Sequence, residues 1–332
     1  MKKVYIITGA NGFLGNNIIR NIKLGADDEI RALVRSDSNV DSLNGLNCSI
    51  YLGDVTDVNS LEKIFDVSGD KIVCIHCAAV VYIKNKYDKN VFDVNVNGTI
   101  NIAKKCIEKN AKLIYISTVH AIKEPKDNSI IIETDKFNPN EVKGFYAKSK
   151  SEALKKLLNM SKNQNLDVVV LHPSGIIGPN DYSNTHLTNL IMKVANGSLH
   201  YIVEGGYNFV DVRDVSEAII NAIDKGKNGE CYIVANRYAS IKELCDIVCD
   251  YVNLKKVKII PFSLALFGVP FCEFYYNLMR KTPLFTKYSL YTLKTNSNFS
   301  NLKAKKELNF YPREFTSTIK DTVDWLKSVN KL

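Results

Sequence analysis

The chain has 332 residues, of which 45% are hydrophobic and 24% are charged, and its formal net charge is +9. This composition excludes an intrinsically disordered chain, a collagen-like repeat and a small disulfide-stabilised scaffold. The excess of basic residues is modest and spread along the chain, so it does not indicate the clustered basic surface of a nucleic-acid-binding protein. We therefore expect no nucleic-acid partner.

Eight cysteines are scattered along the chain, mostly in apolar runs, which is typical of buried free thiols in a reducing compartment. Cys74 and Cys77 are spaced like half of a metal site, but no second pair follows at zinc spacing, so we expect no metal. The N-terminal residues lead into a glycine-rich turn instead of a secretion signal, and no run of 18 apolar residues occurs. These features predict a cytoplasmic protein without a membrane span.

Short apolar segments alternate with amphipathic ones through the first half of the chain. Segments rich in Val, Ile and Tyr predict strands over 4–8, 30–35, 49–54, 71–77, 112–117 and 167–173. The clearest helices are predicted over 87–110 and 145–164. Continuous apolar strands that alternate with helices indicate a parallel sheet covered on both faces, so the expected fold class is α/β, with a doubly wound Rossmann sheet.

The alternation becomes less regular after Pro173. Residues 174–185 are rich in Gly, Pro and Asn and predict a loop. The elements predicted after it are helices over 186–196, 213–224, 240–253 and 315–330, and strands over 209–212 and 230–235. We expect these later strands to return to the first sheet. The expected organisation is a Rossmann domain (1–174, with returning segments at 206–240), a smaller substrate lobe (175–205 and 255–300) and a closing helical segment (301–332).

A glycine-rich turn follows the first strand, with the sequence Thr8-Gly9-Ala10-Asn11-Gly12-Phe13-Leu14-Gly15. The first glycine permits a tight turn, the second lets a pyrophosphate approach the backbone, and the third lets the helix pack on the strand. The N-terminus of the next helix offers free N–H groups to the phosphates. The pattern predicts a dinucleotide site, and the alternative is a strand–turn–helix with incidental glycines.

The tip of the second strand bears on which dinucleotide is bound. Arg35 and Ser36 lie there, whereas the acidic residues 27–29 precede the strand, at its other end. An arginine suits a 2′-phosphate, so the sequence favours NADP over NAD, with a solvated surface charge as the alternative for Arg35. Asp54 follows the third strand, where it can accept from the adenine amino group or cap the next helix. The small residues Ala78-Ala79 end the fourth strand and leave room for a flat cofactor.

A tyrosine and a lysine, Tyr146 and Lys150, lie four residues apart at the start of the predicted helix 145–164. Residues at this spacing share a helix face, so the ammonium group would favour the phenolate and bring the tyrosine pKa closer to neutrality. Thr118 ends the preceding strand at the same edge and can orient a carbonyl oxygen. Together the three residues indicate proton transfer beside a hydride carrier. For the Tyr–Lys pair alone, the alternative is an ordinary surface pair.

These motifs, in this order, resemble those of the extended short-chain dehydrogenase/reductases, the NAD-dependent epimerase/dehydratase family. The matching segments are TGANGFLG, GDVTD, HCAA, NVNGT, Ser117-Thr118, YAKSK, HPSGIIGP and FVDVRDV, together with the C-terminal tail. The Val-Arg tip after the second strand is similar to that of the dihydroflavonol-reductase-like and hydroxysteroid-dehydrogenase-like branch.

The resemblance implies a role for each matching position. The pyrophosphate would lie against Gly9, Gly12, Phe13, Leu14 and Gly15, the 2′-phosphate against Arg35 and Ser36, and the adenine against Asp54 and Val55. The nicotinamide half would be lined by Ala78, Ala79, Asn95, Pro173 and Ser174. Tyr146 would be the acid–base residue, Lys150 would bind the nicotinamide ribose, and Thr118 would take the usual Ser/Thr position. His172, where many relatives have Arg, is expected to be partly buried and not catalytic.

The residues after Thr118 bear on the type of reaction. Val119 and His120 supply no acidic pair, which argues against a 4,6-dehydratase. The expected activity is NADP-dependent reduction of a ketone or aldehyde, or oxidation of the alcohol. A NAD-dependent sugar-nucleotide epimerase is the first alternative, with basic residues of the smaller lobe binding the diphosphate: Arg280, Lys281 and Lys287. A non-catalytic dinucleotide-binding sensor is the second alternative.

The segment 262–293 is crowded with aromatic residues. It fits an apolar wall for the substrate, and the alternatives are ordinary core, a dimer face or, over 262–279, an amphipathic helix resting on a membrane. The family resemblance implies a homodimer through the two long helices at 87–110 and 145–164.

Overall fold

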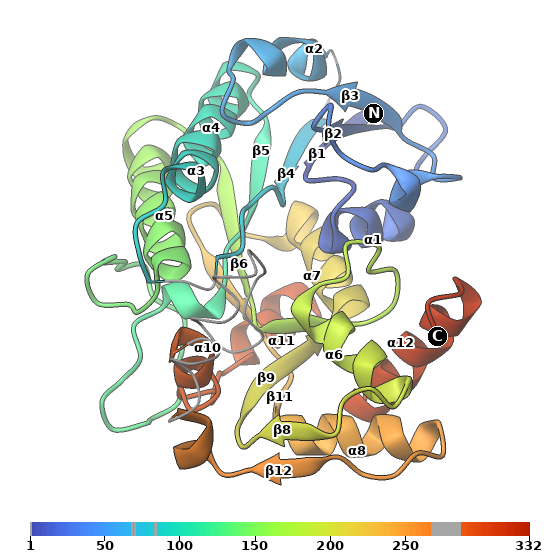
Figure 1. The fold of residues 1–332 in the computed structure, drawn as a ribbon. Helices are drawn as coiled ribbons and strands as arrows, with labels where there is room; N and C mark the ends of the chain where they lie inside the picture. Colours follow the sequence, from blue (N-terminus) through green and yellow to red (C-terminus); the bar gives the residue numbers. More distant parts are fainter. Residues whose placement is uncertain (1, 68, 70, 83–84, 267–286) are drawn as a thin grey trace.

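The computed structural model describes residues 2–67, 69, 71–82, 85–266 and 287–332. Seven parallel strands form one sheet in the order β10-β6-β5-β4-β1-β2-β3 (Figure 1). They are β1 (Lys3–Thr8), β2 (Glu29–Val34), β3 (Ser49–Leu52), β4 (Lys71–His76), β5 (Lys112–Ile116), β6 (Val168–Pro173) and β10 (Cys231–Val234). The chain order reverses between β1 and β4, as in a doubly wound sheet. The predicted fold class is confirmed.

Side chains of successive strand residues pack into two different apolar layers. In β6, Val168 and Val170 belong to the layer under α4 (Thr99–Glu108) and α5 (Phe145–Asn163). Val169 and Leu171 pack on the other face, under α1 (Phe13–Asn21) and α7 (Val212–Lys225), with α11 (Leu302–Leu308) at its edge. Both faces of the central strands are therefore buried, which explains why these strands are continuous apolar runs in the sequence, whereas the edge strand β3 is largely exposed.

The predicted helix over 87–110 is interrupted in the structure. It consists of α3 (Lys89–Phe92), a π-helical segment (Asp93–Gly98) and α4. The side chain of Asp88 caps α3 by accepting from Val91 N. Single π-helical turns are often found at functional sites, and this one contains Asn95, one of the predicted site residues. A short helix, α2 (Glu62–Phe65), precedes β4.

Two smaller sheets and three helices enclose a third apolar core at the carboxyl side of the main sheet (Figure 1). The sheets contain β7 (Gly175–Ile177), β9 (Gly206–Asp211) and β11 (Arg237–Ser240), and separately β8 (Tyr201–Val203) and β12 (Lys258–Ile260). The helices are α6 (His186–Ala195), α8 (Ile241–Tyr251) and α12 (Phe315–Ser328). A further short helix, α10, spans Lys287–Thr292.

The two later strands that we expected to return to the first sheet behave differently. β10 joins it beside β6, whereas β9 pairs with β7 and β11 in the three-stranded sheet. β10 has apolar side chains in both layers of the main sheet, which suits a doubly covered strand. β9 instead contains Asn208, whose side chain bonds Asn236 N and the Ser297 carbonyl. The predicted loop over 174–185 contains β7, which is too short to show a period in the sequence.

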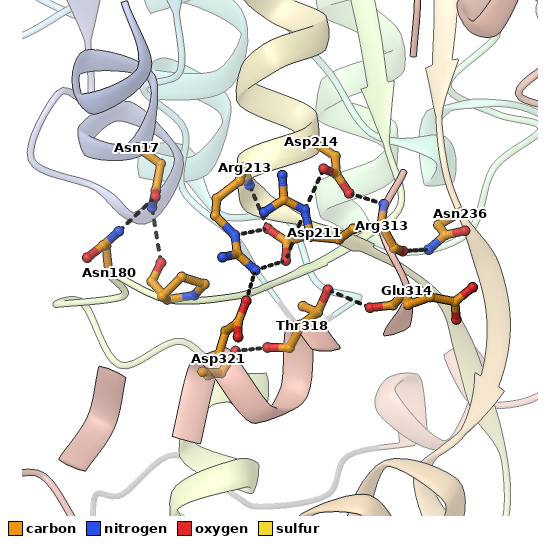
Figure 2. A network of polar contacts seen from close by, with 12 residues as sticks. Asn17, Asn180, Asp211, Arg213, Asp214, Asn236, Arg313, Glu314, Thr318 and Asp321 are labelled. Atoms are coloured by element: carbon orange, nitrogen blue, oxygen red, sulfur yellow. Dashed lines mark hydrogen bonds and ion pairs between the residues drawn. The ribbon is translucent and has the colours of Figure 1, made fainter. Parts of the chain in front are cut away.

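Ion pairs to two buried carboxylates help to hold the segment before α12 against α7 (Figure 2). Asp211, at the end of β9, accepts from Arg213 Nε and Nη2 at 3.0 and 2.7 Å. Arg313 donates its backbone N–H and its Nε to Asp214 at 2.8 and 2.7 Å. Arg213 also bonds Asp321 on α12 at 2.7 Å. This network joins the start of α7 to the C-terminal segment, which lies 99 to 108 residues later in the chain.

The loop after β7 is bonded to α1 (Figure 2). Asn16 and Asn17, both buried on α1, donate to the carbonyls of Asn180 and Pro179 at 3.1 and 3.3 Å. Asn180 Nδ2 in turn donates to Asn17 Oδ1 at 3.1 Å. The loop thus packs against the helix that follows the glycine-rich turn.

Within the described ranges, we find no helix with the length and apolar character that crossing a bilayer requires. Residues 262–266 are helical, but most of the predicted aromatic segment 262–293 lies outside the described residues, as does most of the proposed membrane-resting helix 262–279.

Candidate active site

The glycine-rich turn leaves no space for side chains where it meets β4. Gly9 has φ +62°, and a Cβ there would lie 2.8 Å from Ala78 N. A Cβ at Gly15 would lie 2.2 Å from the carbonyl oxygen of Gly9. Gly12 is the N-cap of α1 and has no side chain to cap the first turn, so the N–H groups of that turn are available to a phosphate. Phe13 is buried and Leu14 is partly buried in the same turn.

A groove of about 300 Å³ runs from this turn across the ends of β2, β3 and β4. Predicted residues that line it are Gly9, Gly12, Arg35, Asp54, Val55, Ala78 and Ala79. The other lining residues, to which we had assigned no individual cofactor contact, are Asn11, Leu33, Val34, Ser38, Gly53, Cys77, Val80 and Val94. Most of them flank a predicted residue at the same strand end, and that position is the signal that could have identified them. The groove and its glycine cradle fit the nucleotide half of a dinucleotide.

The turn after β2 gives Arg35 and Ser36 different positions. Arg35 lines the groove with its side chain 59% exposed, and its Nε lies 3.4 Å from an oxygen of Asp37. Ser36 is exposed and lies outside the lining of the groove. A tight turn, closed by the bond from Ser38 N to the Arg35 carbonyl at 3.1 Å, returns Ser38 to the groove instead. Ser38 therefore replaces Ser36 as the hydroxyl beside Arg35.

Asp54 lines the groove and does not cap the following helical turn. Its Oδ1 accepts from the backbone N and the hydroxyl of Thr56 at 2.8 and 2.7 Å. The next helical turn begins at Asn59, whose N–H is bonded by Asp57. The capping alternative for Asp54 is therefore wrong, because the turn starts too late in the chain.

Asn95 is completely buried in the π-helical segment. Its amide bonds both polar backbone atoms of Val80, at 2.8 and 3.0 Å, and donates to Ser149 Oγ at 3.0 Å. Ser149 Oγ donates to the carbonyl of Tyr146 at 2.7 Å. We expected Asn95 to line the nicotinamide half, but its amide is bonded within the protein, where it connects a groove residue to the helix of the Tyr–Lys pair.

Lys150 lies on α5 with only 2% of its surface exposed, while Tyr146 on the same helix is partly buried. Lys150 Nζ donates to the Ile116 carbonyl at the end of β5, at 2.7 Å, and lies 4.7 Å from the centre of the Tyr115 ring. Burial lowers the pKa of Lys150 to about 7, partly opposed by the nearby Cys77 thiol. Since Cys77 lines the groove, the structure brings this amino group to the cofactor edge of the sheet.

Thr118 lies two residues after the end of β5 and is buried. Its Oγ1 accepts from His120 N at 3.3 Å, so the hydroxyl keeps its own proton for donation. The Thr118 carbonyl lies 3.0 Å from His172 Nδ1, which must carry the proton because a carbonyl only accepts. His172 is completely buried, not partly buried as we expected, and stacks on Phe137. Burial lowers the pKa of His172 to about 4, so a neutral ring orients the Thr118 backbone.

Two further hydroxyls lie buried at the carboxyl ends of β5 and β6. Ser117 Oγ and Ser174 Oγ have no hydrogen-bond partner among the described residues. Pro173 is buried at the end of β6, next to Ser174, and neither of them lines the nucleotide groove. Buried polar atoms usually have a partner, so unpartnered hydroxyls at this edge fit a bound polar group such as a carboxamide.

A sequence model of the NAD dependent epimerase/dehydratase family matches residues 5–235. The chain belongs to this family. The resemblance to extended short-chain dehydrogenase/reductases is thereby confirmed, and the chain is an enzyme of their NAD(P)-dependent type. The non-catalytic sensor alternative falls away.

Relatives of similar length support the same assignment. The chain is 26% identical to "Sterol demethylase protein B" of Methylococcus capsulatus, over 97% of this chain and 98% of that protein. It is 29% identical to "Putative dihydroflavonol 4-reductase" of Synechocystis, over 73% of this chain and 70% of that protein. The solved structure of gox2253 superposes with a TM-score of 0.83 and 28% identity, covering 99% of both chains.

Proposed function

We propose that this enzyme uses NADP to reduce a ketone or aldehyde group of an apolar, ring-containing substrate, or to oxidise the corresponding alcohol. The observation that carries the proposal is the buried Lys150, which shares a helix with Tyr146 and contacts the strand that leads to Thr118. The groove residue Cys77 lies close enough to Lys150 to affect its pKa, which relates these groups to the groove that fits a dinucleotide.

Each residue of the pair has a defined task in this reaction. When bound, the nicotinamide supplies or accepts a hydride. Tyr146 transfers the proton to or from the substrate oxygen. Lys150, when protonated, favours the phenolate form of Tyr146 and thereby lowers the tyrosine pKa. Thr118 donates its hydroxyl proton to the same substrate oxygen and holds it in place.

Aromatic side chains beside Tyr146 support an apolar substrate. Phe145 packs on Tyr87 with a ring-centre distance of 5.2 Å and on Tyr82 at 6.2 Å. Tyr87 and the neighbouring Val81 are exposed. This cluster follows the groove residue Val80 in sequence and includes Phe145, the first residue of α5 and the neighbour of Tyr146 in sequence. The names of the two curated relatives, a sterol demethylase protein and a dihydroflavonol reductase, also refer to ring systems.

The choice of NADP rests on Arg35 at the tip of β2. Its exposed guanidinium lines the groove beside Ser38, so both side chains can bind a 2′-phosphate. Asp37 opposes this preference, because its carboxylate lies next to the same guanidinium.

The epimerase alternative receives no support from the described residues. Of the basic residues it would use, Arg280 and Lys281 lie outside them, and the side chain of Lys287 is not described. An epimerase of this kind would be purified with bound NAD and would gain thermal stability from a UDP-sugar.

The proposal is tested by following the oxidation of NADPH in the presence of a sterol ketone, a flavanone, a small aldehyde and a UDP-sugar. We expect turnover with the ring ketones, faster with NADPH than with NADH. Tyr146→Phe should lower kcat by about 10²- to 10⁴-fold and leave the Kd for NADPH near the wild-type value. Lost binding with residual turnover would contradict the role of Tyr146, and activity on the UDP-sugar alone would contradict the substrate class.

A further inference from the structure

A buried chain of hydrogen bonds centred on His76 runs beneath the cofactor groove. His76, the last residue of β4, is completely buried. Its Nδ1 lies 2.7 Å from Thr8 Oγ1 at the end of β1, and its Nε2 lies 3.0 Å from Thr99 Oγ1 at the start of α4. The His76 ring thus connects the ends of β1 and β4 to the start of α4.

The partners determine the direction of each bond. Thr99 Oγ1 donates to the Asn95 carbonyl at 2.8 Å, so its oxygen accepts from the His76 Nε2–H. His76 Nδ1 then accepts the hydroxyl proton of Thr8, whose oxygen accepts from Ala78 N at 3.2 Å. Burial lowers the pKa of His76 to about 3, so the ring stays neutral and keeps this arrangement over the working pH range.

One end of the chain holds the cofactor-binding turn. Thr8 directly precedes Gly9, and the bond from Ala78 N ties the end of β4 to it. Gly9 and Ala78 both line the groove, and a Cβ at Gly9 would collide with the backbone of Ala78. The Thr8 hydroxyl therefore helps to hold together the two strand ends that line the groove.

The other end reaches the helix of Tyr146. Thr99 and Asn95 belong to the same helical stretch, and the Asn95 amide bonds Val80 and Ser149 Oγ. Ser149 Oγ donates to the Tyr146 carbonyl at 2.7 Å. The path from His76 to the backbone of Tyr146 is therefore continuous.

The His76 ring also supports the site of Lys150. It stacks on Tyr115 with a ring-centre distance of 5.9 Å and an interplanar angle of 23°. Lys150 Nζ lies 4.7 Å from the centre of the same tyrosine ring. His76 is thus in contact, directly or through one residue, with the cofactor turn, the π-helical segment and the lysine site.

We propose that His76 is a positioning residue that couples the cofactor-binding turn to the catalytic helix through its two ring nitrogens. The link from His76 to Tyr146 rests on the proposed function. The link from His76 to the glycine-rich turn affects dinucleotide binding alone, which can be measured without turnover.

Two substitutions of His76 distinguish its link to Thr8 from its link to Thr99. The amide of His76→Asn approximates the position of Nδ1, so this variant keeps the bond to Thr8 and loses the one to Thr99. His76→Gln approximates Nε2 and does the reverse. The readouts are the Kd for NADPH by fluorescence titration, kcat at saturating cofactor, and Tm.

We expect His76→Asn to lower kcat about tenfold with a Kd within about twofold of the wild type, because one buried hydrogen bond is lost on the catalytic side. We expect His76→Gln to raise the Kd about tenfold with kcat within about threefold. A general loss of packing would not separate Kd from kcat in this way.

The chain offers a matched control for the Thr99 link. Thr99 and Thr322 are both completely buried threonines that donate to the carbonyl four residues earlier, at 2.8 and 2.6 Å. Thr99→Val should reproduce the kcat loss of His76→Asn. Thr322→Val, on α12, should lower Tm and leave Kd and kcat unchanged.

The proposal is overturned if both His76 variants change Kd and kcat in parallel, or if they lower only Tm, as Thr322→Val does. If neither His76 variant folds, Thr99→Val and Ser149→Ala carry the test, and wild-type kcat in both would overturn it. The proposed function fails separately, when Tyr146→Phe retains turnover; a raised Kd in His76→Gln would then still support the link to the turn.

Discussion

Two of the regions in which the protein buries charged side chains treat that charge in opposite ways. Between β9, α7 and α12, the carboxylates of Asp211 and Asp214 are 1% and 3% exposed and are matched by Arg213 and Arg313. At the carboxyl edge of the main sheet, Lys150 is buried to the same degree, yet its partners are a carbonyl, an aromatic ring and a thiol. No ion pair with Lys150 is found among the described residues.

We attribute this difference to function: the paired carboxylates stabilise the fold, whereas Lys150 has a chemical role under the proposed function. A buried carboxylate that lost its guanidinium would be left uncompensated, so the paired network fastens the C-terminal segment in one position. A lone buried ammonium is costly, and burial lowers the pKa of Lys150 to about 7. Under the proposed function, this cost is offset because an amino group with a pKa near neutrality can assist proton transfer by Tyr146. Arg35 and Asp37 form a third, exposed pair in which solvent screens the interaction.

Breaking the paired network should have the largest effect on stability. Asp214→Ala leaves the Arg313 guanidinium and its backbone N–H without their acceptor, so we expect the free energy of unfolding to fall by about 2–4 kcal/mol. Urea denaturation measures this change. Asp321→Ala is the control, because its side chain is 46% exposed and its loss should cost less than about 1 kcal/mol. Equal costs for the two variants would contradict the distinction between buried and exposed partners.

Removing the exposed arginine should affect cofactor choice and not stability. Arg35→Ala should weaken NADPH binding by about 1.5–3 kcal/mol and NADH binding much less, because only NADPH has a 2′-phosphate. Titration with both cofactors measures the difference, and NADH serves as the internal control. Equal weakening of both would refute the 2′-phosphate role.

Replacing Lys150 should stabilise the protein and abolish its catalytic activity. The pKa of Lys150 is about 7 in the folded protein and about 10.4 in an unfolded chain. The unfolded chain therefore binds more protons between these values, and the free energy of unfolding of the wild type rises with pH across that range. The cost of burial is fully present below about pH 7.

Lys150→Met removes this cost and also the bond to the Ile116 carbonyl. We expect a gain of about 1–2 kcal/mol in the free energy of unfolding at neutral pH, a flatter pH dependence and a large loss of kcat. Urea denaturation at neutral and alkaline pH tests the gain in stability and the flatter pH dependence. A wild-type stability that does not rise with pH would show that Lys150 stays protonated in the folded state.

The smallest expected effect concerns Asp37. Asp37→Ser removes a carboxylate beside the 2′-phosphate position, so the Kd for NADPH should fall by about two- to fivefold, and less at high salt. Asp27→Ser, at the other end of β2, is a control of the same charge change. If both variants tighten NADPH binding equally, the effect is one of net charge and not of the Arg35–Asp37 pair.

The predicted strands of the main sheet and the start of α5 needed no tertiary information. Strand ends and helix spacing are local properties, so Gly9, Thr118, Tyr146 and Lys150 could be assigned to one sheet edge from their order alone. Similar local reasoning missed Ser38, because the turn that returns it to the groove depends on the bond to the Arg35 carbonyl. It also placed β9 in the wrong sheet, since pairing partners are chosen across the chain.

By itself, the sequence determined an alternating α/β chain with a dinucleotide turn and a Tyr–Lys pair, because those features are encoded in neighbouring residues. Only the tertiary structure decided that Lys150 is buried with no carboxylate partner among the described residues, and that the Asn95 amide bonds other parts of the protein. It also decided that the His76 ring is bonded to Thr8 on one side and to Thr99 on the other. Burial and hydrogen-bond partners depend on elements brought together by folding, and no local pattern specifies them.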